Sequence, residues 1–118
     1  MQLVTYHSYS DLKLVLMVDD NSSDIWEKIK ELREERGLLQ RQLSAALEID
    51  TPMYSKIERG ERKAKRSQIP IMAKLFEIDE KELLTIWLAD KVLDTVENED
   101  EIKSDAIIYA QNEINAEQ

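Results

Sequence analysis

The stretch EIDTPMYSKIERGERKAKR, residues 48–66, decides how the rest of the chain is interpreted. Its first part is typical of a helix start, because Asp50 and Thr51 are both residue types that cap helix N-termini. Pro52 biases the residue before it towards extended backbone angles, and proline suits the first helical position. The sequence therefore predicts a short helix over 51–59, with Thr51 favoured over Asp50 as its cap and Pro52 as its first residue.

The second part of the stretch combines a buried helix face with a basic segment. Tyr54 and Ile57 are three residues apart, so they share one side of the helix and are expected to point into a core. Gly60 follows, and four of the five residues at 62–66 are Lys or Arg. Such a segment can lie along a nucleic-acid backbone, where phosphate contacts supply much of the affinity.

Charge is distributed unevenly along the chain, whose formal net charge is −9. Trp26 to Lys74 hold 12 Lys/Arg and 8 Asp/Glu, or +4. Residues 1–25 carry −3, and Glu77 to Gln118, with 3 Lys and 13 Asp/Glu, carry −10. Because salt screens charges beyond about 8–10 Å, a local basic segment can bind phosphates on an acidic protein. The acidic remainder is expected to weaken non-specific DNA binding.

Apolar residues recur at helical spacing on both sides of the opening stretch. They predict helices at 24–36 and 40–47, tightly connected to the helix at 51–59, and another within 67–78. The expected inward-facing residues are Ile25, Ile29 and Leu32, then Leu39, Leu43 and Leu47, then Ile69, Met72, Ala73 and Phe76. Ser23 or Asp24 is expected to cap the first of these helices, and Gly37 to end it.

A long helix is expected next, with Asp79 as its cap and Glu82 at capping-box spacing. Its apolar residues cover more than one face, and such a helix needs a second partner besides its own domain. The residues assigned to that second contact, as a dimer interface, are Leu84, Trp87, Leu88, Val92 and Val96. A final helix is expected over the segment that holds Ile102, Ala106, Tyr109 and Ala110.

The composition excludes several classes of protein. There is no Cys, so disulfides and thiolate chemistry are excluded, and the longest apolar run, LVLMV at 14–18, is far too short to cross a bilayer. We expect a soluble, cytoplasmic protein. One His, at position 7, and no Gly-rich phosphate loop leave no constellation for catalysis, so we expect no enzyme activity, no metal and no cofactor.

The three tightly connected helices are a helix-turn-helix candidate in which Glu48 occupies a turn site that is often glycine. LLQRQLSAALEIDTPMYSKIERGERKAKR resembles this motif in the Cro/CI-repressor (XRE) family, which has Gln early in helix two and ends in S-[RK]-[IL]-E-[RN]-G. Here these features are Gln40 and SKIERG at 55–60. The resemblance covers about 25–78. It implies an all-α, five-helix lambda-repressor-like domain whose third helix lies in the major groove and whose fifth begins near Glu80.

The resemblance also implies roles for individual residues. Arg33 would pair with Glu58 and tie helix one to helix three. The positions that would read bases are Thr51, Pro52, Met53, Ser55 and Lys56. Those that would contact phosphates are Gln40, Arg41, Arg59, Arg62, Lys63, Lys65 and Arg66.

The start of the third helix departs from the family pattern. Many members carry Gln there, which can bind adenine at two points, whereas this chain has Thr51 and Pro52. Lys56 suits the O6 and N7 atoms of guanine, and Pro52 or Met53 suits a thymine methyl group. We therefore expect Lys56 to be the main reader.

The resulting organisation has three parts: an N-terminal extension at 1–21 (a short strand or disordered), a DNA-binding domain at 22–78 and a C-terminal helical dimerisation region at 79–118. The first functional hypothesis is a repressor or autoregulator that binds a near-palindromic operator on double-stranded DNA as a homodimer. The alternative is an antitoxin or other interaction module whose acidic C-terminal helices cover a basic partner such as a toxin. Restriction–modification, phage and toxin–antitoxin settings stay open.

Overall fold

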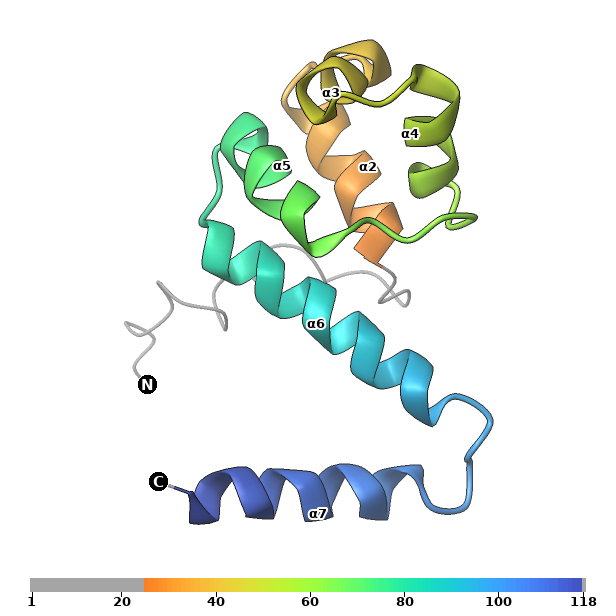
Figure 1. Ribbon diagram of the computed structural model, residues 1–118, viewed down its shortest axis with the longest axis vertical. Helices are drawn as coiled ribbons and strands as arrows, with labels where there is room; N and C mark the ends of the chain where they lie inside the picture. Colours follow the sequence, from red (N-terminus) through yellow and green to blue (C-terminus); the bar gives the residue numbers. More distant parts are fainter. Residues whose placement is uncertain (1–24, 118) are drawn as a thin grey trace. The chain divides into compact units, whose positions relative to one another are not determined.

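The computed structural model of the chain describes residues 25–117, and within this range all regular secondary structure is helical. Figure 1 shows the α-helices in order: α2 (Ile25–Glu35), α3 (Gln40–Leu47), α4 (Thr51–Glu58), α5 (Ile69–Phe76), α6 (Glu80–Val96) and α7 (Lys103–Ala116). A 3-10 turn, η2 (Arg66–Gln68), precedes α5. The predicted all-α class is confirmed. The expectations for 1–21, and for Ser23 or Asp24 as a cap, lie outside the described residues.

The described part of the chain divides between Leu88 and Ala89 into two compact units, residues 25–88 and 89–117. In the first unit, α4 packs on α2 and α3, and α5 packs on α3 (Figure 1). Their apolar faces and the first turns of α6 share one core of buried residues: Ile25, Ile29, Leu32, Leu43, Leu47, Tyr54, Ile57, Ala64, Ile69, Met72, Ala73, Phe76, Leu83 and Ile86. No helix in the described range is long and apolar enough to cross a bilayer.

One expected core residue is exposed. Leu39 was grouped with Leu43 and Leu47, but 46% of it is accessible. The reason is local, because Leu39 precedes α3 with extended angles (φ −97°, ψ 155°) and therefore does not share the helix's periodicity. Its N–H donates to Gln42 Oε1 at 2.7 Å, which satisfies one of the free amides at the start of α3.

The turn between α3 and α4 depends on a left-handed residue. Glu48 has φ 60° and ψ 41°, and its N–H donates to the Ala45 carbonyl at 3.1 Å. The next N–H, of Ile49, donates to the Ser44 carbonyl at 3.0 Å, so the last turn of α3 is closed by backbone hydrogen bonds. A side chain in this region costs about 1–2 kcal/mol. Gly37, at φ 69°, ends α2 as predicted.

The prediction of Thr51 as the cap of α4 is wrong, because Asp50 is the cap. The Asp50 carboxylate accepts the Met53 N–H at 2.7 Å from an extended backbone (φ −79°, ψ 160°). Thr51 is the first helical residue and Pro52 the second. Thr51 is helical although a following proline disfavours helical backbone angles. Asp50 supplies the capping oxygen instead, and the Thr51 hydroxyl is bonded to Ser44 Oγ at 3.0 Å.

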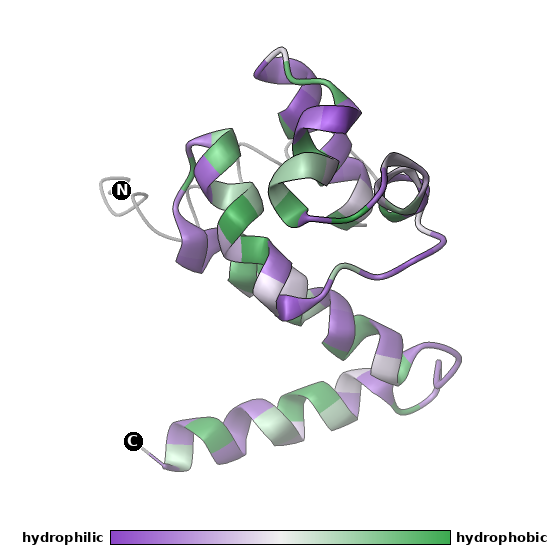
Figure 2. Ribbon diagram, turned by 45° about the horizontal axis from the view of Figure 1, so that its top comes forward, coloured by the Kyte–Doolittle hydropathy of each residue, from purple (hydrophilic) through white to green (hydrophobic). Residues whose placement is uncertain are grey.

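The second unit contains the last turns of α6 and all of α7. Every residue from Glu97 to Glu117 is exposed, including several large apolar ones: Ile102, Ile107, Ile108, Tyr109 and Ile114. Figure 2 shows apolar residues distributed along α7 among polar ones. In this single chain, α7 therefore buries none of its apolar side chains.

Candidate nucleic-acid interface

Helix α4 has an inner and an outer face. Tyr54, Ile57 and Glu58 are buried. The residues at the complementary positions are exposed or half-buried, and they are Thr51, Pro52, Ser55, Lys56 and Arg59. Met53 is half-buried as well. The base-reading residues proposed from the sequence, with the exception of Met53, thus share the outer side of one helix.

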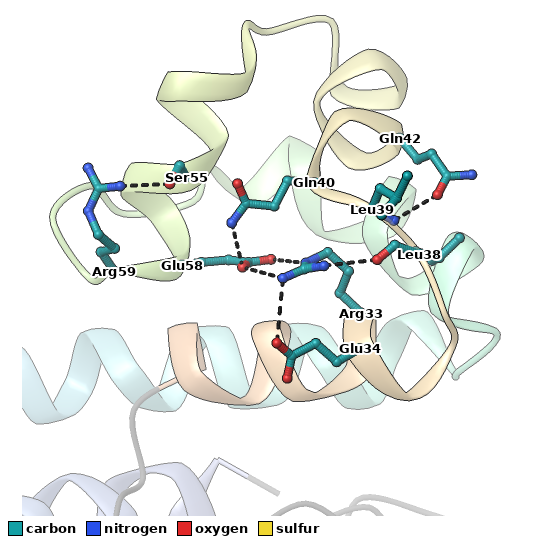
Figure 3. Close-up of polar contacts among 9 residues, drawn as sticks. All are labelled: Arg33, Glu34, Leu38, Leu39, Gln40, Gln42, Ser55, Glu58 and Arg59. Atoms are coloured by element: carbon teal, nitrogen blue, oxygen red, sulfur yellow. Dashed lines mark hydrogen bonds and ion pairs between the residues drawn. The ribbon is translucent and has the colours of Figure 1, made fainter.

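The position of α4 is fixed by a buried ion pair (Figure 3). Arg33 Nε of α2 donates to Glu58 Oε2 at 2.7 Å, and Arg33 Nη2 donates to Glu58 Oε1 at 3.1 Å. Only 2% of the Glu58 side chain and 11% of the Arg33 side chain are accessible. Arg33 Nη1 also donates to the Leu38 carbonyl at 2.8 Å, before α3 begins. This cluster joins the segments that carry the helix-turn-helix.

The pair is ionised in the folded protein. Burial alone would raise the pKa of the Glu58 carboxyl, but the interactions with Arg33, the adjacent Tyr54 hydroxyl and Gln40 outweigh it and hold that pKa below its ordinary value. The hydrogen bond to Glu58 correspondingly raises the pKa of Arg33. Burial, followed by the adjacent Glu58, strongly raises the pKa of the Tyr54 phenol. The carboxylate therefore stays charged inside the fold.

Gln40, assigned to a phosphate, is held in place by the same carboxylate. Its Nε2 donates to Glu58 Oε1 at 3.0 Å from the first residue of α3 (Figure 3). An amide nitrogen has two hydrogens, so one remains to donate to an anion outside the protein. The neighbouring Arg41 is exposed.

Arg59, also assigned to a phosphate, is engaged on the protein surface. Its Nε and Nη2 donate to the Glu61 carboxylate at 2.8 and 3.2 Å, and its Nη1 donates to Ser55 Oγ at 2.6 Å. A guanidinium has five N–H donors, so two remain. The pairing of Arg59 with Glu61 was not predicted from the sequence. The only sequence signal for it is that a carboxylate follows an arginine by two residues, with Gly60 between them.

The basic segment at 62–66 has a fixed backbone and exposed cationic side chains. Ala64 is buried in the core, and its carbonyl accepts the Trp87 indole N–H at 2.8 Å. The Lys65 N–H donates to Gln68 Oε1 at 2.8 Å. Four side chains of the segment are exposed: Arg62, Lys63, Lys65 and Arg66. The role of Trp87 as anchor of this segment was also missed from the sequence.

The proposed dimer residues differ in their surroundings. Leu84 and Trp87 are partly buried against the core of the first unit, so they have partners within the chain. Leu88 and Val92 are exposed by 56% and 43%, and Val96 is half-buried.

A buried serine behind α4 was missed as well. Ser44 lies on α3, is 4% exposed, and donates its hydroxyl hydrogen to the Arg41 carbonyl at 3.1 Å. Its Oγ lies 3.0 Å from Thr51 Oγ1, which brings a base-reading candidate into contact with the scaffold. The seven-residue separation across a turn carries no periodic signal in the sequence.

The comparison with protein families agrees with this geometry. Residues 29–83 match a family model described as helix-turn-helix, the one for Cro/CI-type regulators. No curated protein and no solved structure matches the chain at a significant level. The matched range runs from the middle of α2 into α6 and includes the Arg33–Glu58 pair and the outer face of α4. Residues 29–83 are therefore similar to the Cro/CI-type (XRE) helix-turn-helix family, and this similarity supports a DNA-binding transcriptional regulator.

Proposed function

We propose that the protein is a repressor or autoregulator that acts in the cytoplasm and binds a near-palindromic operator as a homodimer. The observation that carries the proposal is the outer face of α4. It presents Thr51, Ser55 and Lys56 side by side, while the inner face is held by the buried Arg33–Glu58 pair. A rigid helix with a polar, cationic outer face suits the major groove, which is wide enough to admit one helix.

Affinity and specificity would come from different residues. The side chains proposed to contact phosphates would supply a salt-dependent, sequence-independent share of the affinity: Gln40, Arg41, Arg59, Arg62, Lys63, Lys65 and Arg66. Lys56 would donate to guanine O6 and N7 as the main reader, and Pro52, the apolar residue on the outer side of α4, would contact a thymine methyl group. Glu77 to Gln118 carry a net charge of −10. This charge would repel DNA that approaches the protein in any orientation other than with α4 in the groove.

The dimer would form through the C-terminal region. Leu88, Val92 and Val96 recur every four residues and so follow one stripe along α6, and two of them are exposed. Most soluble oligomers are homo-oligomers, with two-fold dimers the commonest. Two α4 helices related by such an axis would read half-sites centred roughly 34–36 Å apart.

The test is a selection of bound sequences from random duplex DNA at about 150 mM salt. At this ionic strength surface charges are screened as they are under physiological conditions. The mass of the protein in solution is measured alongside. A dimer that enriches a two-fold symmetric site supports the proposal, whereas a folded protein that enriches no sequence contradicts it.

A matched pair of lysine variants tests the assignment of α4. Lys56→Ala is expected to weaken specific binding by about 1–3 kcal/mol and to relax the preference at one base pair per half-site. Lys81→Ala, an exposed lysine at the start of α6, serves as the control and should leave the preference unchanged. Unchanged affinity and preference in Lys56→Ala would show that another residue reads the operator.

The exposed C-terminal unit favours a second candidate function, the binding of a basic partner protein. Residues 89–118 carry 9 Asp/Glu and 2 Lys, a net charge of −7, together with exposed apolar side chains on α7. Acidic residues around apolar ones would complement a basic surface, as in an antitoxin that covers a toxin.

The salt dependence of binding distinguishes the two partners proposed for the C-terminal unit, a second copy of the chain and a basic protein. A homodimer brings two like-charged segments together, so added salt should strengthen it by screening their repulsion. A complex with a basic partner should weaken with salt, since screening removes an attraction. Sedimentation of the purified protein at about 50 and about 500 mM salt, which span long and short screening lengths, measures the first effect.

A further inference from the structure

Two hydroxyl groups on the outer side of α4 are bonded to the protein in different ways. Thr51 Oγ1 is bonded to Ser44 Oγ at 3.0 Å, and Ser55 Oγ is bonded to Arg59 Nη1 at 2.6 Å. A hydroxyl normally both donates and accepts, because it has one hydrogen and two lone pairs. Its partner in the protein decides which of these capacities is left for DNA.

Either hydroxyl could donate in the contact between Thr51 and Ser44, and the second bond of Ser44 decides the direction. Ser44 has a single hydroxyl hydrogen, which it donates to the Arg41 carbonyl at 3.1 Å. Ser44 Oγ can therefore only accept from Thr51, so the hydrogen between the two oxygens belongs to Thr51. Thr51 Oγ1 then has lone pairs left and no hydrogen to give to a base.

The Ser55 hydroxyl is the acceptor in its bond to Arg59. A guanidinium has donors and no acceptor, so Ser55 must receive the hydrogen and keeps its own. Bonds to a charged donor are stronger than neutral ones, and linked hydrogen bonds polarise one another. Glu61 holds the guanidinium at this place through two further hydrogen bonds of 2.8 and 3.2 Å. Ser55 thus keeps its own hydroxyl hydrogen available as a donor beside a positive charge.

We infer that Ser44 and Arg59 are positioning residues that fix opposite hydrogen-bonding roles, Thr51 as an acceptor and Ser55 as a donor, in the reading of bases. The inference rests on the proposed function, because it requires α4 to enter the major groove. Thr51 then selects a base that offers an amino group on the edge it faces, cytosine N4 or adenine N6. Ser55 selects an acceptor: guanine O6 or N7, adenine N7 or thymine O4.

The test compares base preferences in bound-sequence selections with variants that remove a positioning residue and leave the reading residue in place. Thr51→Val and Ser55→Ala first identify the base pair that each hydroxyl reads. Ser44→Ala frees the Thr51 hydrogen, so the preference at the Thr51 position is expected to fall from about two- to tenfold, the size of one neutral hydrogen bond, towards parity. The preference at the Ser55 position should not change.

Arg59→Met gives the reciprocal result. It removes the donor to Ser55, so the base preference at the Ser55 position is expected to fall by the same factor of about two to ten. The base preference at the Thr51 position should not change. A general loss of affinity is also expected, since Arg59 is a proposed phosphate contact, but that loss is uniform across sequences. Ser104→Ala, a serine of α7, is the matched control and should change neither position.

The outcomes separate this inference from the function on which it rests. If the wild-type protein enriches no site, the proposed function fails. If it enriches a site and folded Ser44→Ala and Arg59→Met keep the wild-type preferences, the function stands and this inference is overturned. Should Ser44→Ala fail to fold, Ser44→Cys keeps the volume with a weak acceptor sulfur, and the same relaxation at the Thr51 position is expected.

Discussion

Glu58 accepts hydrogen bonds from two helices at once, from Arg33 of α2 at 2.7 and 3.1 Å and from Gln40 of α3 at 3.0 Å. Because Glu58 itself belongs to α4, this one carboxylate connects the three helices that define the motif. Its environment excludes most water, so Arg33 is needed to balance the buried charge, and the Gln40 amide satisfies a further lone pair of the carboxylate.

Removal of one member of this pair should be strongly destabilising. Arg33→Met leaves the Glu58 charge buried and unpaired, and is expected to cost about 3–5 kcal/mol in the free energy of unfolding. The double variant Arg33→Met, Glu58→Leu should cost clearly less than the two single variants together, because no uncompensated charge remains. Urea unfolding of the four proteins measures this, and strictly additive effects would argue against a coupled pair.

The same pair predicts how stability depends on pH. The pKa of Glu58 is lower in the folded than in the unfolded chain, so the unfolded state takes up the proton first as pH falls. The stabilisation is complete above the unfolded pKa of about 4.3 and is lost as pH falls through the folded pKa. The stability difference between wild type and Glu58→Gln should therefore shrink below that pH. A constant difference between pH 6 and pH 3, about one unit beyond the unfolded pKa, would contradict this.

Gly60 should tolerate no side chain. It has φ 77°, and a Cβ built there would lie 2.8 Å from the Trp26 indole. Gly60→Ala is expected to cost about 2–3 kcal/mol, from left-handed strain together with the overlap. Gly37→Ala is the matched control, since it has φ 69° and no atom within 4 Å of its Cβ position. It should cost only the strain of about 1 kcal/mol. If thermal unfolding showed equal losses of stability in Gly60→Ala and Gly37→Ala, the Trp26 side chain would move away from the added methyl group without cost.

Tyr54→Phe should be close to neutral or slightly stabilising. The Tyr54 ring is fully buried, and its hydroxyl oxygen has no hydrogen-bond partner in the described part of the chain. Removal of an unsatisfied buried polar atom relieves a desolvation cost of about 1 kcal/mol. Chemical denaturation measures the change. A loss of more than about 1 kcal/mol, the worth of one hydrogen bond, would reveal that the phenol is bonded after all.

Trp87→Phe should affect DNA binding from a distance. The indole N–H holds the Ala64 carbonyl at 2.8 Å, and Ala64 lies between Lys63 and Lys65. Loss of this bond is expected to cost about 1 kcal/mol of stability and to weaken DNA binding severalfold, because the basic segment becomes less ordered. Trp26→Phe, the other tryptophan, provides a comparison. If folded Trp87→Phe binds DNA with unchanged affinity, the basic segment at 62–66 does not belong to the proposed interface.

Local patterns in the sequence were sufficient for much of the first unit. The 3.6-residue spacing of Ile25, Ile29 and Leu32 or of Met72, Ala73 and Phe76 reflects how a helix meets a core, so it can be read without knowledge of the fold. Gly37 ended its helix for a reason intrinsic to the residue, the ease of a positive φ. The same information led to Leu39 being assigned to the core, because periodicity does not say where a helix begins.

The hydrogen-bonding partners of the site required the tertiary structure. Asp50 and Thr51 are both capping residue types, and only the structure shows that Asp50 caps the helix while the Thr51 hydroxyl is bonded to Ser44 of another helix. Trp87 and Ala64 are 23 residues apart, and Arg33 and Glu58 are 25 apart. No periodicity connects such pairs, and the second was expected only from the family resemblance.

The sequence by itself determined the helical class and the approximate helix positions, because these depend on spacing along one chain segment. Only the tertiary structure decided that Ser44 and Arg59 bond the two hydroxyls of α4, that Trp87 holds the basic segment, and that Gln40 shares the Glu58 carboxylate. The physical reason is that a hydrogen bond depends on distances of about 3 Å between atoms, and packing sets those distances.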